Sequence, residues 1–303
     1  MRGLSDSRVR SAALAVPLGL ALVAAPVARA ATLKPETRAA FQRYVQLTDQ
    51  RNQRELHGEG PFLWIDGLAE ADRTEAHARV AAGEVEIARL ETRENGKAIP
   101  CPGGLLHHWI GTAFVPGATL QQLLDVLEDY DRHADYYRPD VERSRIESRD
   151  GDHFRVFLRF RRTKIITVVL DTEHDVQYFR GGAARAHSRS STIRIAQVED
   201  AGKQGEHEKT PGDDDGFLWG METWWRLEER DKGVYVQSEV VSLTRDIPMG
   251  LGWMIGPFVT SVPKESLKFT MEATRRAALR NSSVGRGAPA KDPGRQRDRL
   301  RGW

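Results

Sequence analysis

The sequence predicts an α+β fold in which a curved antiparallel sheet packs against a long C-terminal helix. A strand pair and a helical segment come first, a long run of strands follows, and one helical segment closes the domain. Strands grouped between helices are typical of α+β folds, whereas wound α/β folds alternate the two elements. One helix is too narrow to fill the concave side of about six or seven strands. We therefore expect either side chains or a ligand cavity to fill that space.

The first thirty residues have the pattern of a secretory signal peptide. Three arginines form a basic n-region, an apolar run follows, and Ala28-Arg29-Ala30 gives the small-x-small cleavage pattern. A membrane anchor is the alternative, but two prolines interrupt the run, which is shorter than the roughly 20 apolar residues of a membrane span. We expect cleavage after Ala30 and an exported protein, either periplasmic or secreted.

The composition of the 303-residue chain is that of a globular protein, with 40% hydrophobic and 29% charged residues. Residues 1–30 carry a net charge of +3, whereas the whole chain carries +2. The remaining residues therefore carry a net charge of about −1. This balance does not indicate a nucleic-acid partner, and we expect the basic tail at 281–303 to be disordered. The single Cys101 cannot form an intramolecular disulfide, so the exported domain depends on its hydrophobic core.

Residues 31–83 are expected to form a helical extension before the main domain at 84–280. The segment 34–56 is strongly charged with one apolar helical face, and the segment 70–82 is rich in alanine and glutamate. Between them, PFLWIDGL is a short apolar stretch that we expect to dock onto the main domain.

The main domain begins with period-two patterns. VEIARLETR alternates apolar and charged residues, the turn ENGK follows, and LLHHWIGTAFV is a second strand candidate. TLQQLLDVLEDY then has a helical leucine stripe, with Thr119 as its predicted N-cap. FRVFLRF places Phe154 and Phe160 on one face and arginines on the other, which predicts a strand with one solvated side.

The second half of the domain continues with strands. IITVVLDTEHDVQYF and SRSSTIRIAQVE precede a polar loop at 199–216. FLWGMETWWRLEERD and VYVQSEVVSLTR are strand candidates joined by the turn residues DKG. VPKESLKFTMEATRRAAL closes the domain as a helix, and its apolar stripe consists of Leu267, Met271, Thr274 and Ala278.

Three segments resemble the START-like superfamily, also called SRPBCC or helix-grip, which includes polyketide cyclase/dehydrase-type proteins. Residues 119–137 resemble its first helix pair, residues 217–248 its last hairpin with the texture WRxEERxxGVYVxxE, and residues 250–277 its closing helix. The resemblance covers roughly 84–279 and rests on element order and texture. It implies a deep apolar pocket between the sheet and the final helix. Members bind sterols, lipids, polyketides or plant hormones, and some are enzymes, so the fold alone does not choose a function.

The resemblance implies a protein that binds or transfers a lipid or another hydrophobic small molecule, and the signal-peptide pattern adds export. We expect transient membrane contact and neither a cofactor nor a metal. The alternative is a cyclase/dehydratase-type enzyme acting on a hydrophobic substrate in the same cavity. A third interpretation is a scaffold with a filled interior whose N-terminal helices bind a partner. The residues expected to contact the ligand are aromatic or methionine: Trp109, Phe154, Phe160, Trp225, Trp253, Met254, Phe258 and Met271.

The connector RDIPMGLGWMIGPFVTSVPKE at 245–265 combines glycines with bulky apolar side chains. In one interpretation Trp253, Met254 and Phe258 cover the pocket entrance, and the glycines let the backbone flex. In a second, these side chains join the helix to the sheet. In a third they touch a membrane interface, which exposed Trp and Phe favour.

Three histidine-containing segments are candidates for chemistry. His107 and His108 are adjacent on a strand and point to opposite faces, which favours structural roles over a metal pair. The acidic run at 129–135 lacks the glycine and terminal glutamate of a calcium loop, so we expect a solvated helix–helix corner. His174 is the candidate acid or base if its strand faces the cavity.

Arg245 is the second catalytic candidate, because an arginine at the end of a strand can hold a carboxylate or phosphate group. A local pair with Asp246 is the alternative. No GxSxG, HExxH, Walker or GxGxxG element occurs in a suitable context, so the sequence gives no support for nucleophilic, metal-hydrolytic or nucleotide chemistry.

Overall fold

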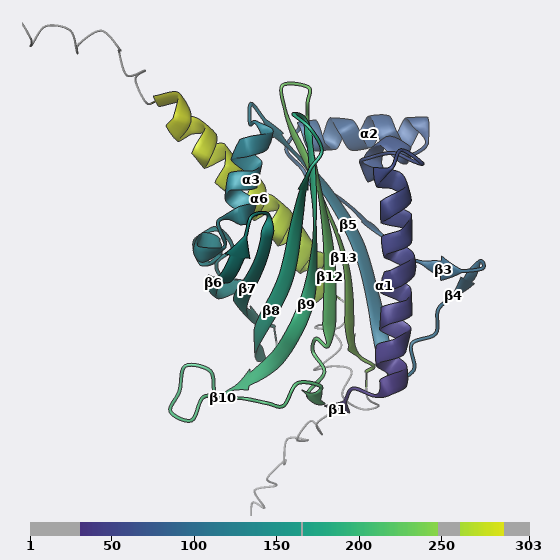
Figure 1. Ribbon diagram of the computed structural model, residues 1–303, viewed down its shortest axis with the longest axis vertical. Coiled ribbons are helices and arrows are strands. Elements are labelled where there is room, and N and C mark those ends of the chain that lie inside the picture. Colours follow the sequence, from purple (N-terminus) through teal and green to yellow (C-terminus); the bar gives the residue numbers. More distant parts are fainter. Residues whose placement is uncertain (1–30, 165, 248–260, 288–303) are drawn as a thin grey trace, which may run out of the picture.

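The computed structural model describes residues 31–164, 166–247 and 261–287. The predictions on residues 1–30, on residues 288–303 and on Trp253, Met254 and Phe258 lie outside these ranges. In the described part, one antiparallel sheet of nine strands has the order β2-β5-β13-β12-β9-β8-β7-β6, with β10 added to β9 (Figure 1). The predicted α+β, helix-grip architecture is confirmed.

The helices are α1 (Pro35–Leu56), α2 (Glu70–Ala81), α3 (Leu120–Glu128), α4 (His133–Tyr136) and α6 (Val262–Gly287), with 3-10 turns η1 (Trp64–Gly67) and η2 (Tyr130–Arg132). The long strands are β5 (Gly104–Pro116), β6 (Val141–Asp150), β7 (His153–Thr163), β8 (Thr167–Arg180), β9 (Arg185–Glu199), β12 (Gly220–Arg230) and β13 (Gly233–Arg245). The short strands are β1 (Ala31–Thr32), β2 (Glu86–Arg89), β3 (Arg93–Glu94), β4 (Lys97–Ala98), β10 (His207–Glu208) and β11 (Asp213–Asp214).

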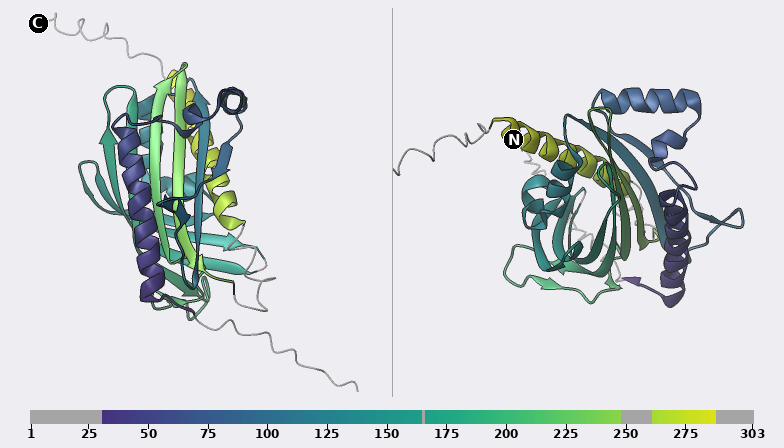
Figure 2. Two further views of the ribbon diagram at one scale, coloured as in Figure 1. Left: turned by 90° about the vertical axis from the view of Figure 1, so that its right-hand side faces the viewer. Right: turned by 45° about the horizontal axis from the view of Figure 1, so that its top comes forward.

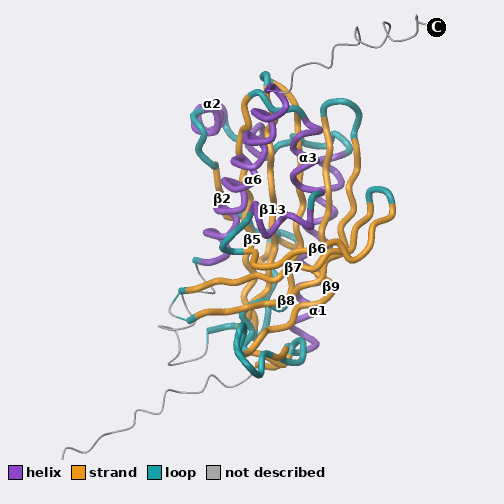
Figure 3. Tube along the Cα trace, turned by 90° about the vertical axis from the view of Figure 1, so that its left-hand side faces the viewer, coloured by secondary structure: helices purple, strands orange, loops and turns teal. Residues whose placement is uncertain are grey.

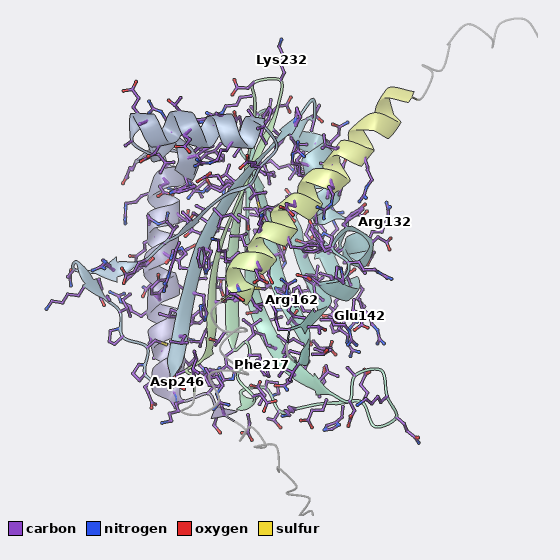
Figure 4. All side chains as sticks on the ribbon, turned by 180° about the vertical axis from the view of Figure 1, so that it is seen from behind. Arg132, Glu142, Arg162, Phe217, Lys232 and Asp246 are labelled. Atoms are coloured by element: carbon purple, nitrogen blue, oxygen red, sulfur yellow. The ribbon has the colours of Figure 1, made fainter. Side chains whose placement is uncertain are left out.

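Helix α6 lies across the concave face of the sheet, as the view from behind shows (Figure 4). The four residues of its predicted apolar stripe are all buried. Gly111 on β5 lies at this contact, where a Cβ atom would be at an ordinary van der Waals distance of 3.4 Å from side-chain atoms of Leu267 and Met271. The helix is thus held against the sheet at one end of the concave face.

The N-terminal extension covers the convex face, on the side of the sheet opposite α6 (Figure 2). Leu63 and Ile65 of the apolar segment are fully buried in a cluster with Phe114 and Tyr235, so the predicted docking is confirmed. A second cluster beneath α1 buries Trp224. Both faces of the central strands are therefore covered, each by a different part of the chain.

The hairpin β12–β13 sets the register at the centre of the sheet. Asp231 and Lys232 have φ angles of 54° and 59°, as a two-residue turn of type I′ requires. The sheet is strongly twisted, and β7 and β8 run crosswise to β5 and β13 (Figure 3). A bulge between Glu173 and His174 shifts the pairing of β8 with β9. Bulges of this kind increase local twist and redirect side chains.

Three boundaries differ from the sequence prediction. Helix α6 continues to Gly287, past the predicted domain end at 280. Once a helix has formed, each further residue that becomes ordered gains one hydrogen bond, so the helix extends readily. The polar loop at 199–216 contains the short strands β10 and β11. The ENGK turn closes a separate hairpin, β3–β4, while β2 pairs directly with β5. Within the described ranges, no helix is long and apolar enough to cross a bilayer.

Candidate functional site

A cavity of about 290 Å³ lies between the concave face of the sheet and helix α6. Ligand pockets for small molecules usually measure roughly 300–1,000 Å³, and an engineered dry cavity of about 150 Å³ already binds benzene. The wall is mainly apolar and includes Leu127, Leu158, Leu170, Val176 and Val240. A hydrophobic guest of modest size therefore fits the space.

The hollow exists because small side chains occupy the concave face of the central strands. Along one cross-strand row, Trp109 pairs with Val240, Val240 with Thr223, and Thr223 with Ser190. The neighbouring row contains Ser238. Directly opposed side chains lie about 4.5–5.5 Å apart, so these short groups form a shallow strip, and residues of α6 form the opposite wall of the cavity.

Three of the predicted ligand-binding residues line this cavity. Trp109 enters from β5, Phe160 from β7 and Trp225 from β12, all from the concave face. They surround the strip of small side chains with aromatic surface. Lys264, in the first turn of α6, lies 5.6 Å from the centre of the Trp109 ring, a cation–π distance.

The remaining predicted residues in the described ranges lie elsewhere. Phe154 is fully buried in the core against the ring of Tyr130, at 5.4 Å between centroids, and is not part of the cavity wall. Met271 is fully buried at the contact of α6 with the sheet. Both belong to apolar stripes that face inward, but an inward face includes packed core as well as cavity wall.

Arg245 does not enter the cavity wall either. Strand residues alternate between faces, and its neighbour Thr244 points to the cavity, so Arg245 lies on the other side. Its guanidinium donates a hydrogen bond to the carbonyl of Asp215 at 3.3 Å. The arginine therefore holds the loop before β12 rather than a ligand in the described cavity.

His174 lies on the cavity wall, 3% exposed. Its Nε2 is 2.8 Å from Thr172 Oγ1, and its Nδ1 is 3.5 Å from Ser190 Oγ. Burial lowers the pKa of His174 to about 4, and the nearby imidazole of His133 lowers it further in the same direction. The ring is therefore neutral at physiological pH and can accept a hydrogen bond.

A cluster of tyrosines and a second histidine forms the wall beneath α3 and α4. Tyr178 donates to the carbonyl of Leu127 at 3.0 Å, and its hydroxyl lies 2.8 Å from that of Tyr130. His133 Nε2 is 3.2 Å from the same carbonyl. Burial lowers the pKa of His133 to about 4 and raises the pKa of both tyrosines above the ordinary range, so the cluster is uncharged.

Charged residues gather where α6 begins. Figure 4 shows Arg162 and Phe217 near this end of the helix and Lys232 at the opposite end of the sheet. Arg162 pairs with Asp140, and its other amine lies 3.4 Å from Glu265. Arg161, Arg162 and Asp140 are the charged members of the cavity wall. The cavity thus has a charged end beside α6 and a neutral polar region at His174.

The adjacent histidines point to opposite faces, as predicted from the strand period. His107 lies 2.9 Å from Thr244 Oγ1, whereas His108 lies 2.7 Å from Glu239 and 3.0 Å from the hydroxyl of Tyr44 on α1. Burial favours a raised pKa for Glu239, but the hydrogen bond from His108 and the charge of Arg51 together lower it. Both histidines therefore have structural partners.

The acidic run at 129–135 forms a structural corner. Asp129 accepts from the hydroxyl of Tyr136 at 2.6 Å, and Asp131 accepts from the backbone amide of Ile146 at 2.7 Å. In the described ranges, no group of three or more His, Cys, Asp or Glu residues is arranged to hold a metal ion. The carboxylates here fix the corner between η2, α4 and β6.

Sequence reasoning missed the hydroxyl residues of the wall. Ser190, Thr223 and Ser238 line the cavity, as do Tyr178 and His133. The alternation along β12 and β13 could have found Thr223 and Ser238, because they share a face with Trp225 and Val240. The contact of Ser190 with His174 could not be predicted in this way, because the bulge at His174 changes the register between β8 and β9.

No family model matches this sequence, and no curated protein matches it. Among solved structures, a STAR-related lipid transfer protein from Xanthomonas axonopodis is 14% identical, with a TM-score of 0.39 over 65% of this chain and 98% of that one. Human STARD10 is 10% identical, with a TM-score of 0.40 over 72% and 83%. The Zhui aromatase/cyclase from Streptomyces sp. R1128 is 18% identical, with a TM-score of 0.32 over 60% and 93%. These are START-like proteins, and at this similarity any function must be argued from the cavity itself.

Proposed function

We propose that this protein binds a lipid or another hydrophobic small molecule in the cavity between the sheet and α6. The observation that carries the proposal is the cavity itself, about 290 Å³ with a mainly apolar wall. A folded domain normally fills its core to crystal-like density, so a retained hollow of this size needs an explanation. The interior is not packed solid, which leaves the scaffold interpretation without support.

The energy of binding is sufficient for a moderate ligand. Burying one methylene contributes about 0.8 kcal/mol, so ten methylenes contribute about 8 kcal/mol. Association costs at least about 4 kcal/mol of lost freedom. The remaining few kcal/mol correspond to a dissociation constant in the millimolar range, and the aromatic wall and polar contacts add to this. Such a ligand is held reversibly, as transfer between membranes requires.

Extraction of the purified protein with organic solvent, followed by mass spectrometry, tests the proposal. Protein prepared from its native host should release more of a hydrophobic compound than a control protein whose cavity is filled. The matched control is a variant whose cavity is filled, Val240→Phe, purified in the same way. Equal amounts of the same compound from both proteins would contradict binding in this cavity.

Export is part of the proposal and rests on the signal-peptide pattern of residues 1–30. We propose that the functional protein begins at Ala31 and works outside the cytoplasm. Intact-mass measurement of the protein from a periplasmic or culture fraction tests this. A mass that includes residues 1–30, found only in the cytoplasmic fraction, would contradict it.

A transient contact with membranes accompanies the transfer role. It is tested by sedimentation with neutral and anionic liposomes at low and high salt. Binding that requires anionic lipid and falls with salt would point to the basic residues near the first turn of α6. Absence of any liposome binding would restrict the protein to soluble ligands.

An enzymatic role of the cyclase or dehydratase kind is the second candidate. It is favoured by one observation, that His174 and the Ser190 hydroxyl meet on the cavity wall. Two facts weaken it: a pKa of about 4 makes His174 a poor base at neutral pH, and Arg245 lies outside the wall. A co-purified compound that is released unchanged after incubation favours the carrier, whereas a chemically altered one favours the enzyme.

A further inference from the structure

The hydrogen bonds around His174 determine which of its ring nitrogens carries the proton. Thr172 Oγ1 donates to the carbonyl of Leu158 at 2.9 Å. Having used its only proton there, the Thr172 hydroxyl must accept from His174 Nε2 at 2.8 Å. Nε2 is therefore the protonated nitrogen, and Nδ1 carries a free lone pair.

This lone pair is poorly satisfied by the protein. Ser190 Oγ lies 3.5 Å away, at the outer limit of a hydrogen bond, whereas a good O–H···N contact is several tenths of an ångström shorter. A buried acceptor without a proper donor costs about 1–3 kcal/mol. A ligand hydroxyl placed between Ser190 and His174 would donate to Nδ1 and accept from Ser190.

A second hydroxyl on the same concave face is also unsatisfied. Ser238 is 1% exposed, belongs to the cavity wall, and its Oγ has no hydrogen-bond partner in the described structure. Ser190 and Ser238 flank Thr223, which pairs directly with Ser190 and lies diagonally across from Ser238. The apolar cavity therefore contains a narrow polar strip across three strands, composed only of neutral groups.

Charge is kept away from this strip. Along β7 and β8, Arg161 and Arg162 pair with Val169 and Val168, which lie five and six residues from His174, or about 17–20 Å along the strand. The groups around His174 are neutral as well: Thr172 on the same strand, and Ser190, the ring of Phe160 and the uncharged His133 from other elements. A carboxylate placed at Nδ1 would lose its hydration and meet a second lone pair.

We propose that His174 is a specificity-determining residue that selects neutral hydrophobic ligands carrying a hydroxyl, or another hydrogen-bond donor, at their buried end. The inference rests on the proposed function, because it concerns the ligand of the same cavity. It assigns the polarity and orientation of that ligand: the donor lies at His174, and any charged group lies toward the first turn of α6.

The test compares ligands of similar length that differ in the head group: an alcohol, an isomeric ether without the donor, and a carboxylate. 1-Dodecanol, 1-methoxyundecane and dodecanoate are titrated against the protein by displacement of the neutral probe 1-aminoanthracene. The wild type should bind the alcohol about threefold to tenfold more tightly than the ether, the range expected for one hydrogen bond. In His174→Leu this alcohol-to-ether ratio should fall to about one.

Two further variants make the readout specific. Thr172→Val removes the group that fixes the tautomer while keeping the side-chain shape, so it should reduce the ratio even if His174→Leu fails to fold. His107→Leu is the matched control, since His107 is also buried and hydrogen-bonded to a threonine but is not part of the cavity wall. Its ratio should equal that of the wild type.

The outcomes separate the inference from the proposed function. If the alcohol preference persists in both His174→Leu and Thr172→Val while the probe still binds, the inference is overturned and the proposed function stands. If the wild type binds neither the probe nor any of the three compounds, both are overturned. Nitrogen-15 NMR of the histidine rings gives a check without any ligand: a protonated Nδ1 at His174 overturns the inference.

Discussion

The guanidinium of Arg226 on β12 lies 2.6 Å from the carboxylate of Glu55 on α1, although 171 positions separate the two residues in the sequence. Arg226 is almost fully buried, and it also donates to the carbonyl of Phe62 at 2.8 Å. A buried charge is tolerated only with partners of this kind. The N-terminal extension is therefore joined to the sheet by a buried ion pair as well as by apolar contacts.

Replacement of Arg226 by alanine is expected to lower the free energy of unfolding by about 3–5 kcal/mol, because it removes a fully buried side chain and leaves Asn52, the Phe62 carbonyl and one carboxylate oxygen of Glu55 without their donor. Urea denaturation followed by circular dichroism measures the change. Arg132→Ala is the matched control: its side chain is 61% exposed and lies 3.5 Å from Asp129, so it should change stability by no more than about 0.5 kcal/mol. Equal effects of the two substitutions would contradict the buried role.

Leu63 is the apolar counterpart of this junction. It is fully buried between η1 and the sheet, so Leu63→Ala should destabilise the protein by about 2–5 kcal/mol through lost burial and a residual cavity. Ile193, on the bulge of β9, is 46% exposed, and Ile193→Ala should change stability by less than about 1 kcal/mol. If Leu63→Ala unfolded only α1 and α2 and left the sheet's denaturation midpoint unchanged, the extension would be an independent unit.

The sequence predicted element types well because each long element carries a regular period. The leucine stripe of α3, the buried face of α6 and the inward Phe154 and Phe160 of β7 all follow from periods of 3.6 or 2. Thr119 accepts from the amide of Gln122 and caps α3 as expected. These features depend on neighbours in the chain, which is the information that a single sequence contains.

The candidate site was predicted less completely, since a cavity wall depends on contacts between distant elements. Phe154 and Trp225 both face inward, yet only Trp225 reaches the cavity, because the Tyr130 and Tyr178 rings surround Phe154. The contact of His174 with Ser190 lies beside the bulge in β8–β9, where His174 pairs with Thr192 and Ser190 pairs with Val176. The alternation of side chains within β8 or β9 does not reveal such a shift of register between the two strands.

Acid should destabilise the protein before its carboxylates titrate. Burial lowers the pKa of His107, His133 and His174 to about 4, from an ordinary value near 6.5. Between these values the unfolded chain binds protons that the folded protein does not, so stability is complete above about pH 6.5 and is lost as the pH falls toward 4. Each histidine contributes up to about 1.4 kcal/mol per pH unit in this window.

Urea denaturation at pH 7.5, 6.5, 5.5 and 5.0 measures this dependence. His174→Gln should lower the slope of stability against pH by about one proton, since glutamine does not titrate. A wild-type stability that is constant from pH 6.5 to 5.0 would show that these rings are protonated in the folded protein.

The cavity itself is tested by two substitutions on one strand. Val240 and Val236 lie four residues apart on the same face of β13; Val240 lines the cavity, whereas Val236 is fully buried in packed core. Val240→Phe should place its ring in the hollow, leave the unfolding temperature unchanged or raised, and weaken displacement of 1-aminoanthracene by 1-dodecanol at least tenfold.

Val236→Phe inserts the same added volume where no space exists. We expect it to lower the free energy of unfolding by about 1–3 kcal/mol, the usual cost of overpacking, because neighbouring side chains must leave their preferred rotamers. Ligand affinity in the folded fraction should stay close to that of the wild type. The contrast between the two variants separates empty space from ordinary apolar core. If Val240→Phe instead destabilises the protein as much as Val236→Phe does, the space beneath α6 is already filled by side chains in solution.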